Sequence, residues 1–187
     1  AIVGLILLGL LVFSATFAPW IAPYDPQQVL IGKEDVRKRE GPCIHLLGCP
    51  EDKPQHILGI DGNVRDQFSR LIYGTRVSLY VGIITVTFAV IVGTLLGAIA
   101  GFFGGIADNV IMRVLDIVLA FPFLLLAIAI VSVIGPGLRN AMLAIAIISI
   151  PIYARVTRAS VLSVREMHFI EASRALGASN WQILFGR

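Results

Sequence analysis

Long runs of apolar residues without a charged side chain alternate with polar segments along the chain. The charge-free runs extend over 1–24, 77–107, 117–138 and 140–154. About 20 mostly apolar residues in a helix cover the ~30 Å hydrocarbon core of a bilayer, and lipid offers backbone N–H and C=O groups no other partner. The pattern therefore predicts four transmembrane helices, over 1–22, 77–103, 108–134 and 140–162.

Composition points to the same class of protein. Hydrophobic residues make up 57% of the 187 residues and charged residues 14%, whereas a soluble domain has about 45–50% and about 25%. The net charge of +3 is small. These values exclude a soluble enzyme domain, a disordered chain and a nucleic-acid-binding protein, and they predict an all-α polytopic membrane protein. Because the chain begins inside an apolar run, we expect it to be part of a longer polypeptide.

The distribution of charge predicts the orientation of the chain in the membrane. Residues 155–187 contain five arginines and two glutamates, whereas 23–76 balances eight basic with eight acidic residues. Basic segments stay on the cytoplasmic side. We therefore expect the C-terminal segment in the cytoplasm and, with four spans, the N-terminal end there too. The 23–76 segment is then extracytoplasmic.

Small residues recur within the second predicted helix. They stand at every fourth position: Ala89, Gly93, Gly97, Gly101 and Gly105. Such a stripe lets a second helix approach closely, although glycine is common in membrane helices generally. Pro122 and Pro151 fall inside the third and fourth predicted helices, where they predict either bends along a pathway or tolerated kinks.

The 23–76 segment contains both cysteines of the chain, Cys43 and Cys49. In an oxidising exterior a local disulfide is the leading interpretation, and two free thiols are the alternative. With His45 and His56 the cysteines could also hold zinc, but the spacing matches no common zinc site. None of these readings implies catalysis.

The end of the same segment has helical periodicity. Apolar residues recur at spacings of three and four over 63–75, and Asp61 with Arg65 and Asp66 with Arg70 are opposite charges four residues apart. Such pairs support a helix. We expect it to lie on the outer membrane surface and lead into the second span; a solvated loop is the alternative.

A short amphipathic segment follows the fourth predicted helix. Residues 166–176 carry apolar side chains on one helical face, and Gly177 stands where a C-terminal cap is expected. Ser179 is a candidate N-cap for a second short helix. On physical grounds alone, helix 166–176 could dock in a partner's groove or lie on lipid.

Two motifs give this pattern a family resemblance. Residues Glu171, Ala172, Ser173 and Gly177 form E-A-S-x3-G, which resembles the E-A-A-x3-G loop of ATP-binding-cassette importer permeases. Residues 56–61 read H-I-L-G-I-D, with R-D and S-R pairs following at 65–66 and 69–70. This stretch resembles the H-P-L-G-T-D-x-x-G-R-D-x-x-S-R segment of dipeptide/oligopeptide permeases, with departures at 57, 60 and 64.

The resemblance implies a fold and an assembly. The chain would belong to a type I ABC importer permease in a bacterial or archaeal cytoplasmic membrane. Its parts would be a first transmembrane helix over 1–22, an extracytoplasmic segment over 23–76 and a permease core over 77–187. This core, with three spans and the cytoplasmic loop, would be C-terminally incomplete. Cytosolic ATPase subunits would bind ATP and Mg²⁺, since the chain has no phosphate-binding loop. A second permease subunit, an extracytoplasmic solute-binding protein and membrane lipids would be the other partners; nucleic acid would not.

The resemblance also implies residue roles. Helix 166–176 would be the coupling helix in a groove of the ATPase, Glu171 would supply a charged contact or cap, Ala172 and Ser173 would be the small residues of the loop, and Gly177 would permit the sharp turn. Movement of this helix would switch the permease between inward-open and outward-open states. Cargo could be a dipeptide, an oligopeptide, an opine or a nickel complex, and we assign no substrate-binding residue.

Two other classes of function fit the sequence less well. An ATP-independent secondary transporter or channel normally needs an ionisable residue deep in the membrane. Only Asp108 and Asp116 lie near the spans, and Arg113 is a candidate partner for Asp116. An intramembrane enzyme is disfavoured because all three histidines lie outside the predicted spans. We therefore assign no catalytic residue and no metal site.

Overall fold

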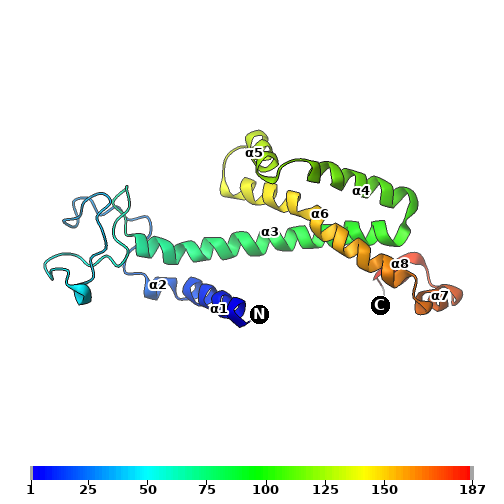
Figure 1. Cartoon of the computed structure of the whole chain (residues 1–187), viewed down its shortest axis with the longest axis horizontal. Coiled ribbons are helices and arrows are strands. Elements are labelled where there is room, and N and C mark those ends of the chain that lie inside the picture. Colours follow the sequence, from blue (N-terminus) through cyan, green and yellow to red (C-terminus); the bar gives the residue numbers. More distant parts are fainter. Residues whose placement is uncertain (1, 186–187) are drawn as a thin grey trace. The chain divides into compact units, whose positions relative to one another are not determined.

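The computed structural model describes residues 2–185, and the described part is helical with isolated β-bridges but no strand (Figure 1). Its elements in chain order are α1 (Ile2–Thr16), α2 (Ala18–Ile21), the 3₁₀ turn η1 (His45–Leu47), α3 (Gln67–Phe103), α4 (Gly105–Ala120), α5 (Phe123–Ile134), α6 (Leu138–Arg165), α7 (His168–Ala175) and α8 (Asn180–Phe185). The chain divides into two compact units, residues 1–81 and 82–187, so α3 continues from one into the other.

The number of membrane spans differs from the predicted four. Among the described helices, α3 and α6 are long and apolar enough to cross a bilayer, and the bent pair α4–α5 makes up to three. Helix α1 has 15 residues, about 22 Å at 1.5 Å per residue, which is shorter than the hydrocarbon core. The structure therefore supports a polytopic membrane protein with two or three spans, and a further span over 1–22 stays a prediction.

The third predicted helix, over 108–134, is broken. Helices α4 and α5 meet at an angle of 96°. Phe121 at the junction has extended backbone angles, φ −88° and ψ 140°. The residue before a proline is disfavoured in the helical region, so Pro122 accounts for the end of α4 at Ala120. In contrast, α6 continues through the buried Pro151.

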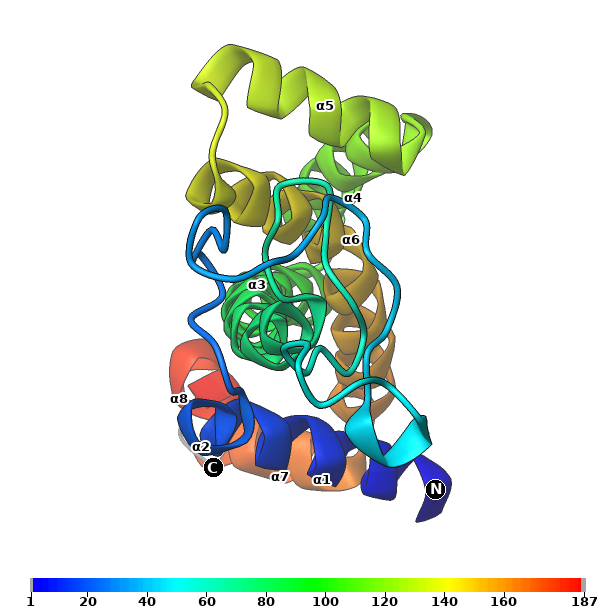
Figure 2. The same cartoon turned by 90° about the vertical axis from the view of Figure 1, so that its left-hand side faces the viewer.

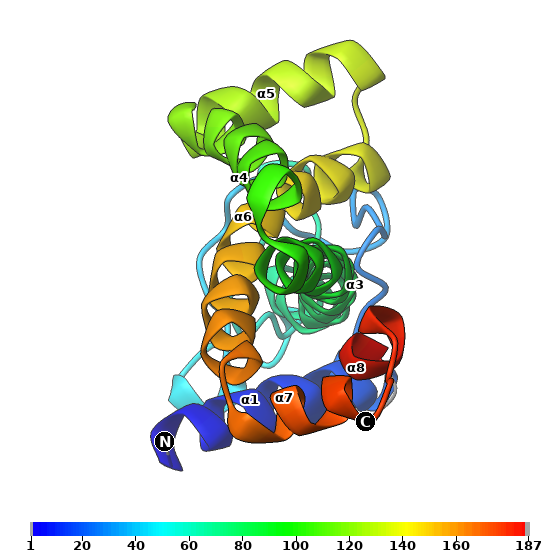
Figure 3. The ribbon, with the colours of Figure 1, turned by 90° about the vertical axis from the view of Figure 1, so that its right-hand side faces the viewer.

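Helices α3 and α6 lie side by side (Figure 3), and glycines of the small-residue stripe of α3 pack directly against α6. A Cβ atom added at Gly93 would lie 2.7 Å from the Tyr153 Cβ and 2.8 Å from the Ile150 carbonyl oxygen, and one at Gly97 would overlap the backbone of Ala154. Gly93 and Gly97 therefore allow the two helix backbones to touch, as the sequence predicted. Gly105, the last residue of the predicted stripe, instead begins α4 and has open space around it. Helices α4 and α5 also pack against α6.

In the first unit, the long segment between α2 and α3 covers the N-terminal end of α3 (Figure 2). A small apolar cluster of Leu30, Ile60 and Val64 holds it together. The helix expected over 63–75 begins later, at Gln67, and continues into the span without a separate surface helix. Val64 has a left-handed φ of 56°, which is incompatible with the helical conformation and explains the later start.

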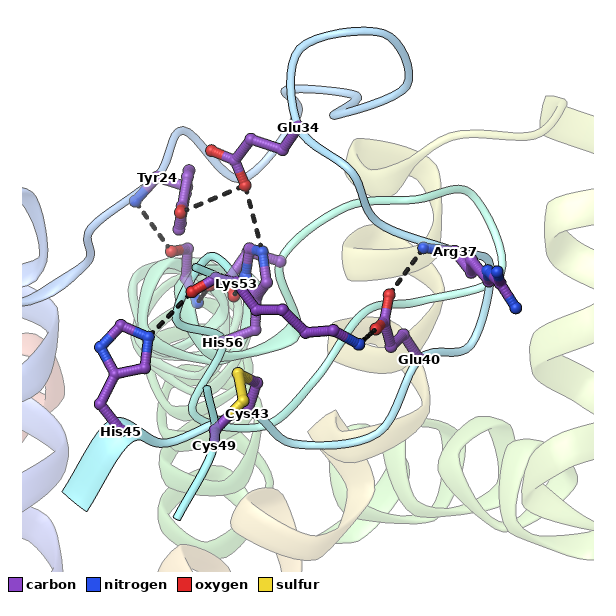
Figure 4. A network of polar contacts seen from close by, with 11 residues as sticks. Tyr24, Glu34, Arg37, Glu40, Cys43, His45, Cys49, Lys53 and His56 are labelled. Carbon is purple, nitrogen blue, oxygen red and sulfur yellow. Dashed lines mark hydrogen bonds and ion pairs between the residues drawn. A yellow bond between two sulfur atoms is a disulfide. The ribbon is translucent and has the colours of Figure 1, made fainter. Parts of the chain in front are cut away.

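A buried polar network fixes this segment to α3 (Figure 4). The ring of His56, 3% exposed, lies 2.9 Å from Asp66 through Nδ1 and 3.2 Å from Glu34 through Nε2. It stacks on Tyr24, whose hydroxyl donates to Glu34 at 3.4 Å. The backbone N–H of Tyr24 donates to the hydroxyl of the buried Ser69 at 3.1 Å. Residues from both ends of the segment are therefore joined to the start of α3.

The predicted ion pairs in this region are only partly present. Asp61 forms ion pairs with Arg65 and Arg70. Asp66 does not pair with Arg70 as predicted; it contacts His56 and accepts a hydrogen bond from the backbone N–H of Ser69 at 2.7 Å. That bond makes Asp66 the N-cap of α3. The four-residue spacing of Asp66 and Arg70 indicated an ion pair on the helix surface. The Asp66 side chain is instead buried, and its carboxylate contacts His56 and the backbone N–H of Ser69.

Candidate functional site

The segment after α6 forms a short helix with a defined end. Helix α7 spans His168–Ala175, slightly shorter than the predicted 166–176. Gly177 has a left-handed φ of +85°. Its N–H donates to the Arg174 carbonyl at 3.0 Å, and the N–H of Ala178 donates to the Ser173 carbonyl at 3.1 Å. This pair of bonds is the Schellman motif, which explains why glycine ends the helix here.

Helix α8 begins at Asn180, three residues after Gly177, with a reciprocal cap. The backbone N–H of Gln182 donates to Ser179 Oγ at 3.3 Å, and the backbone N–H of Ser179 donates to Gln182 Oε1 at 2.9 Å. This is a capping box, and it confirms Ser179 as the predicted N-cap. The two caps fix a tight turn between α7 and α8.

Helix α7 has one covered and one uncovered side. Ile170 is buried and Ser173 is half-buried, with its hydroxyl donating to the Phe169 carbonyl at 2.8 Å. Glu171, with 73% of its side chain exposed, lies 3.7 Å from His168, and Ala172 is exposed beside it. The uncovered side thus offers a carboxylate beside a small side chain, which suits close contact with another surface.

A polar cavity of about 640 Å³ is lined by residues of α7, α8 and the ends of α3 and α6. Two arginines and two glutamates line it together with an asparagine and two phenylalanines: Arg165, Arg174, Glu166, Glu171, Asn180, Phe102 and Phe103. The Arg174 guanidinium lies 5.8 Å from the Phe102 ring centre, and Phe103 and Trp181 have ring centres 5.2 Å apart. Aromatic contacts therefore attach α7 and α8 to the end of α3.

Three arginines on α6 have partners that the sequence did not reveal. Arg158 pairs with Asp108, and Arg155 pairs with Asp116 at 2.6 Å. The prediction that Asp116 pairs with Arg113 is therefore wrong, because α4 turns Asp116 toward α6. Arg165 donates to backbone carbonyls of α3. These arginines are three and seven residues apart, so Arg158 and Arg165 lie on one face of the helix. This spacing is the sequence feature that could have indicated a shared partner for them.

The other predicted site lies in the exterior segment. Cys43 and Cys49 are joined by a disulfide that closes the loop around η1 (Figure 4). His45 contacts the Lys53 carbonyl at 2.8 Å, and His56 is buried in the network described above. In the part of the chain that the structure describes, these four side chains do not converge, and no group of ligands could hold a metal.

Comparison with known families adds to this geometry. The family model described as the binding-protein-dependent transport system inner membrane component matches residues 93–186, half of the chain, including α7 and its glycine cap. The chain belongs to this family. A second family model, the N-terminal TM domain of oligopeptide transport permease C, matches residues 1–42. Membership establishes a multi-pass inner membrane protein of the transport class.

Individual relatives cover nearly the whole chain. It is 44% identical over 189 aligned residues to the di/tripeptide transport system permease protein DppC of Pseudomonas aeruginosa, covering 99% of the chain and 58% of that protein. It is 41% identical to the glutathione transport system permease protein GsiD of Pectobacterium atrosepticum, covering 94% of the chain and 54% of that protein. It is 38% identical to the dipeptide transport system permease protein DppC of Haemophilus influenzae, covering 99% of the chain and 60% of that protein. The chain spans somewhat more than half the length of these relatives.

Proposed function

We propose that the chain is part of a transmembrane permease subunit in an ATP-driven importer of dipeptides, oligopeptides or related small solutes. In this proposal α7 is the coupling helix, and it contacts a cytosolic ATPase that binds ATP and Mg²⁺. The relatives named for di/tripeptide, dipeptide and glutathione transport support the cargo class. Glutathione is itself a tripeptide, so a short peptide backbone is the feature that these cargoes share.

The observation that carries the proposal is the geometry of α7. Its one buried residue is Ile170, while Glu171 and Ala172 are exposed next to a glycine-ended turn. Leu176 at the same end is 89% exposed. A carboxylate and an apolar side chain left uncovered on one rigid turn suit insertion into a groove of a partner.

The proposed topology follows from the position of the coupling helix. The end of α6, α7 and α8 would lie in the cytoplasm together with the corner between α3 and α4. The segment between α2 and α3 would then face the exterior, where a solute-binding protein delivers cargo. A span over 1–22 and a second permease subunit complete this arrangement.

The proposal explains why the acidic residues of α4 need not carry protons. Asp108 and Asp116 both form ion pairs with arginines of α6, so their carboxylates are already neutralised by fixed charges. A secondary transporter would instead need an ionisable group that gains and loses a proton during the cycle. Dependence of uptake on ATP or on a proton gradient therefore distinguishes the ATP-driven importer from a secondary transporter.

The test uses the complete transporter reconstituted in proteoliposomes. Glu171→Arg should abolish peptide uptake and reduce the amount of ATPase that co-purifies with the permease, because the substitution places the wrong charge in the groove. Gly177→Trp should do the same by straining the turn at positive φ. Glu51→Arg makes the same charge change at an exposed exterior position and should leave both quantities unchanged.

Two results would reject the proposal. One is full uptake by both α7 variants with normal co-purification of the ATPase. The other is uptake by the unmodified transporter that continues without ATP but collapses when an uncoupler dissipates the proton gradient, as expected of a secondary transporter.

A further inference from the structure

Two arginines on one face of α6 hold the corner between α3 and α4, here called the α3–α4 corner and defined as residues 101–108. Arg158 contacts Asp108 through two nitrogens: Nε lies 2.5 Å from Oδ1 and Nη2 lies 2.6 Å from Oδ2. Both side chains are partly buried, 33% and 17% exposed. A bidentate guanidinium–carboxylate pair fixes orientation as well as distance, so α6 and the first turn of α4 are held in one register.

The second arginine caps the preceding helix. Arg165, the last residue of α6, donates from Nη1 to the carbonyl oxygens of Gly101 and Phe102, at 3.2 and 3.3 Å. These carbonyls belong to the last turn of α3, where the helix leaves acceptors without intrahelical partners. A cation at this end also interacts favourably with the helix dipole. Arg165 therefore bonds the end of α6 to the end of α3.

Close backbone packing between the two arginines strengthens the attachment. A Cβ atom at Gly101 would lie 3.0 Å from the Arg158 carbonyl oxygen and 3.1 Å from the Val161 Cβ. The helices thus touch at the level where the arginines act. Interfaces of this density move as units and do not deform continuously.

Helix α7 is attached to the same corner. Only Glu166 and Met167 separate it from Arg165. Ile170 and Phe102 line one small apolar cavity of about 240 Å³, and the Arg174 guanidinium lies over the Phe102 ring. A displacement of α7 therefore acts on Phe102, whose carbonyl already accepts a hydrogen bond from Arg165.

We propose that Arg158 and Arg165 are positioning residues that make α7 and the α3–α4 corner move as one body, so that displacement of α7 by the ATPase reaches α3 and α4 as well as α6. This inference rests on the proposed function of α7 as the coupling helix. Without the two arginines, the two-residue joint at 166–167 becomes the weakest part of the connection. ATP hydrolysis would then continue while less of the motion reaches the membrane helices.

Arg155 provides a matched control one turn before Arg158. Its pair with Asp116 also connects α6 to α4, but the two side chains are 54% and 51% exposed and the contact uses a single nitrogen. Exposed pairs of this kind contribute little. Arg155→Met therefore removes the same charge and the same kind of side chain from the same helix without releasing the corner.

The experiment measures peptide uptake, ATP hydrolysis and co-purified ATPase for the complete transporter in proteoliposomes. Arg158→Met and Arg165→Met should keep normal co-purification and near-normal hydrolysis, while peptide taken up per ATP hydrolysed falls at least about fivefold, the lower range of coupling between sites. Arg155→Met should retain the unmodified ratio. A purely structural role would reduce hydrolysis, uptake and assembly together.

A charge exchange separates positioning from folding. Arg158→Asp alone should lower the ratio, and Arg158→Asp combined with Asp108→Arg should restore it, because the pair is rebuilt with its ends exchanged. If Arg158→Met does not accumulate in the membrane, the exchanged pair decides the question by itself. Arg165→Lys should recover part of the ratio, since one donor remains at the end of α3.

Three outcomes would overturn the inference: an unchanged ratio in both methionine variants, an equal fall in Arg155→Met, or no restoration by a folded exchanged pair. Failure of the proposed function is recognised differently. In that case the unmodified transporter would show uptake without ATP, and the ratio would be undefined for every variant.

Discussion

The Nδ1 atom of His56 lies 2.9 Å from one carboxylate oxygen of Asp66, whose other oxygen accepts the N-capping hydrogen bond from Ser69. The buried Asp66 carboxylate therefore both holds the exterior segment through His56 and caps the first turn of α3. The Nε2 atom of the same imidazole faces Glu34 at 3.2 Å. This arrangement makes the folding of the segment and the start of the helix depend on one another.

Asp66→Ala should therefore release the exterior segment. The substitution removes an N-cap, worth about 1 kcal/mol, and leaves the buried His56 without its partner, which costs about 1–3 kcal/mol more. Trypsin should cleave the purified protein faster at the exposed Lys33 and Arg37. Asp52→Ala removes an exposed carboxylate from the same segment and should not alter the cleavage rate. Equal rates in both variants would contradict a holding role for Asp66.

Gly97→Leu should separate α3 from α6. Any side chain at this position overlaps the Ala154 backbone, which cannot move as a flexible side chain can. We expect a loss of folded protein and, where folded protein is obtained, destabilisation of at least about 1–3 kcal/mol. The measurement is the thermal midpoint in detergent, followed by size-exclusion chromatography. Gly82 on the same helix has open space around it, so Gly82→Leu should have little effect; a similar loss there would indicate that helix propensity, and not packing, is responsible.

The Cys43–Cys49 bond should protect both thiols from alkylation until a reductant is added. Closing so short a loop is worth about 2 kcal/mol in the chain-entropy model, so Cys43→Ser with Cys49→Ser should loosen the loop around η1 without unfolding α3. A maleimide mass shift before and after reduction is the direct measurement. Labelling without reductant would indicate free thiols, and labelling only after addition of a chelator would indicate zinc.

The exterior segment should lose stability at low pH. Partial burial raises the pKa of Asp61, but N–H groups of Arg65 and Asn63 and nearby guanidinium groups outweigh it and keep that pKa below its usual value. The backbone N–H of Arg37 likewise lowers the pKa of Glu40, outweighing a smaller opposing effect of burial. A lowered folded-state pKa contributes stability above about pH 4, which is lost as the pH falls through the folded value. Faster pepsin cleavage of the segment on acidification is expected, and Asp61→Asn should reduce the pH dependence.

The same segment should also weaken at high pH. Burial, together with the nearby Glu34, raises the pKa of Tyr24 from 10.0 to about 12. A raised folded-state pKa contributes stability that is complete below pH 10.0 and lost between there and about pH 12. Near-ultraviolet absorbance should show a tyrosine ionisation near pH 12 that is absent in Tyr24→Phe. If the ionisation that Tyr24→Phe removes lay near pH 10.0 instead, the prediction would be contradicted.

Much of the helical architecture followed from local pattern. Apolar runs located α3 and α6 because the length of a span is set by the bilayer, and the fourfold glycine repeat identified the face of α3 that meets α6. Gly177 and Ser179 were recognisable as caps because each acts on backbone groups within a few residues of itself. Pro122 predicted either a bend or a tolerated kink within one span over 108–134, and the structure shows a break of 96°.

Long-range partners could not be predicted in this way. Arg113 was the candidate partner of Asp116 because it lies one helical turn earlier, whereas the structure pairs Asp116 with Arg155, 39 residues away. Asp66 was assigned to Arg70, whereas the buried His56 and the helix start use its two oxygens. In both cases the expected partner was an opposite charge about one turn away on the same predicted helix, and a distant part of the chain supplied the actual one.

The sequence by itself determined the membrane class, the positions of the main helices, their caps and the exposed motif at 171–177, because hydropathy and backbone geometry act over one or two helical turns. Only the tertiary structure decided which carboxylate meets which arginine, that Arg165 caps α3, and that His56 is buried between two acids. These pairings depend on which distant segments pack together, and the spacing of charges along the sequence does not show which segments those are.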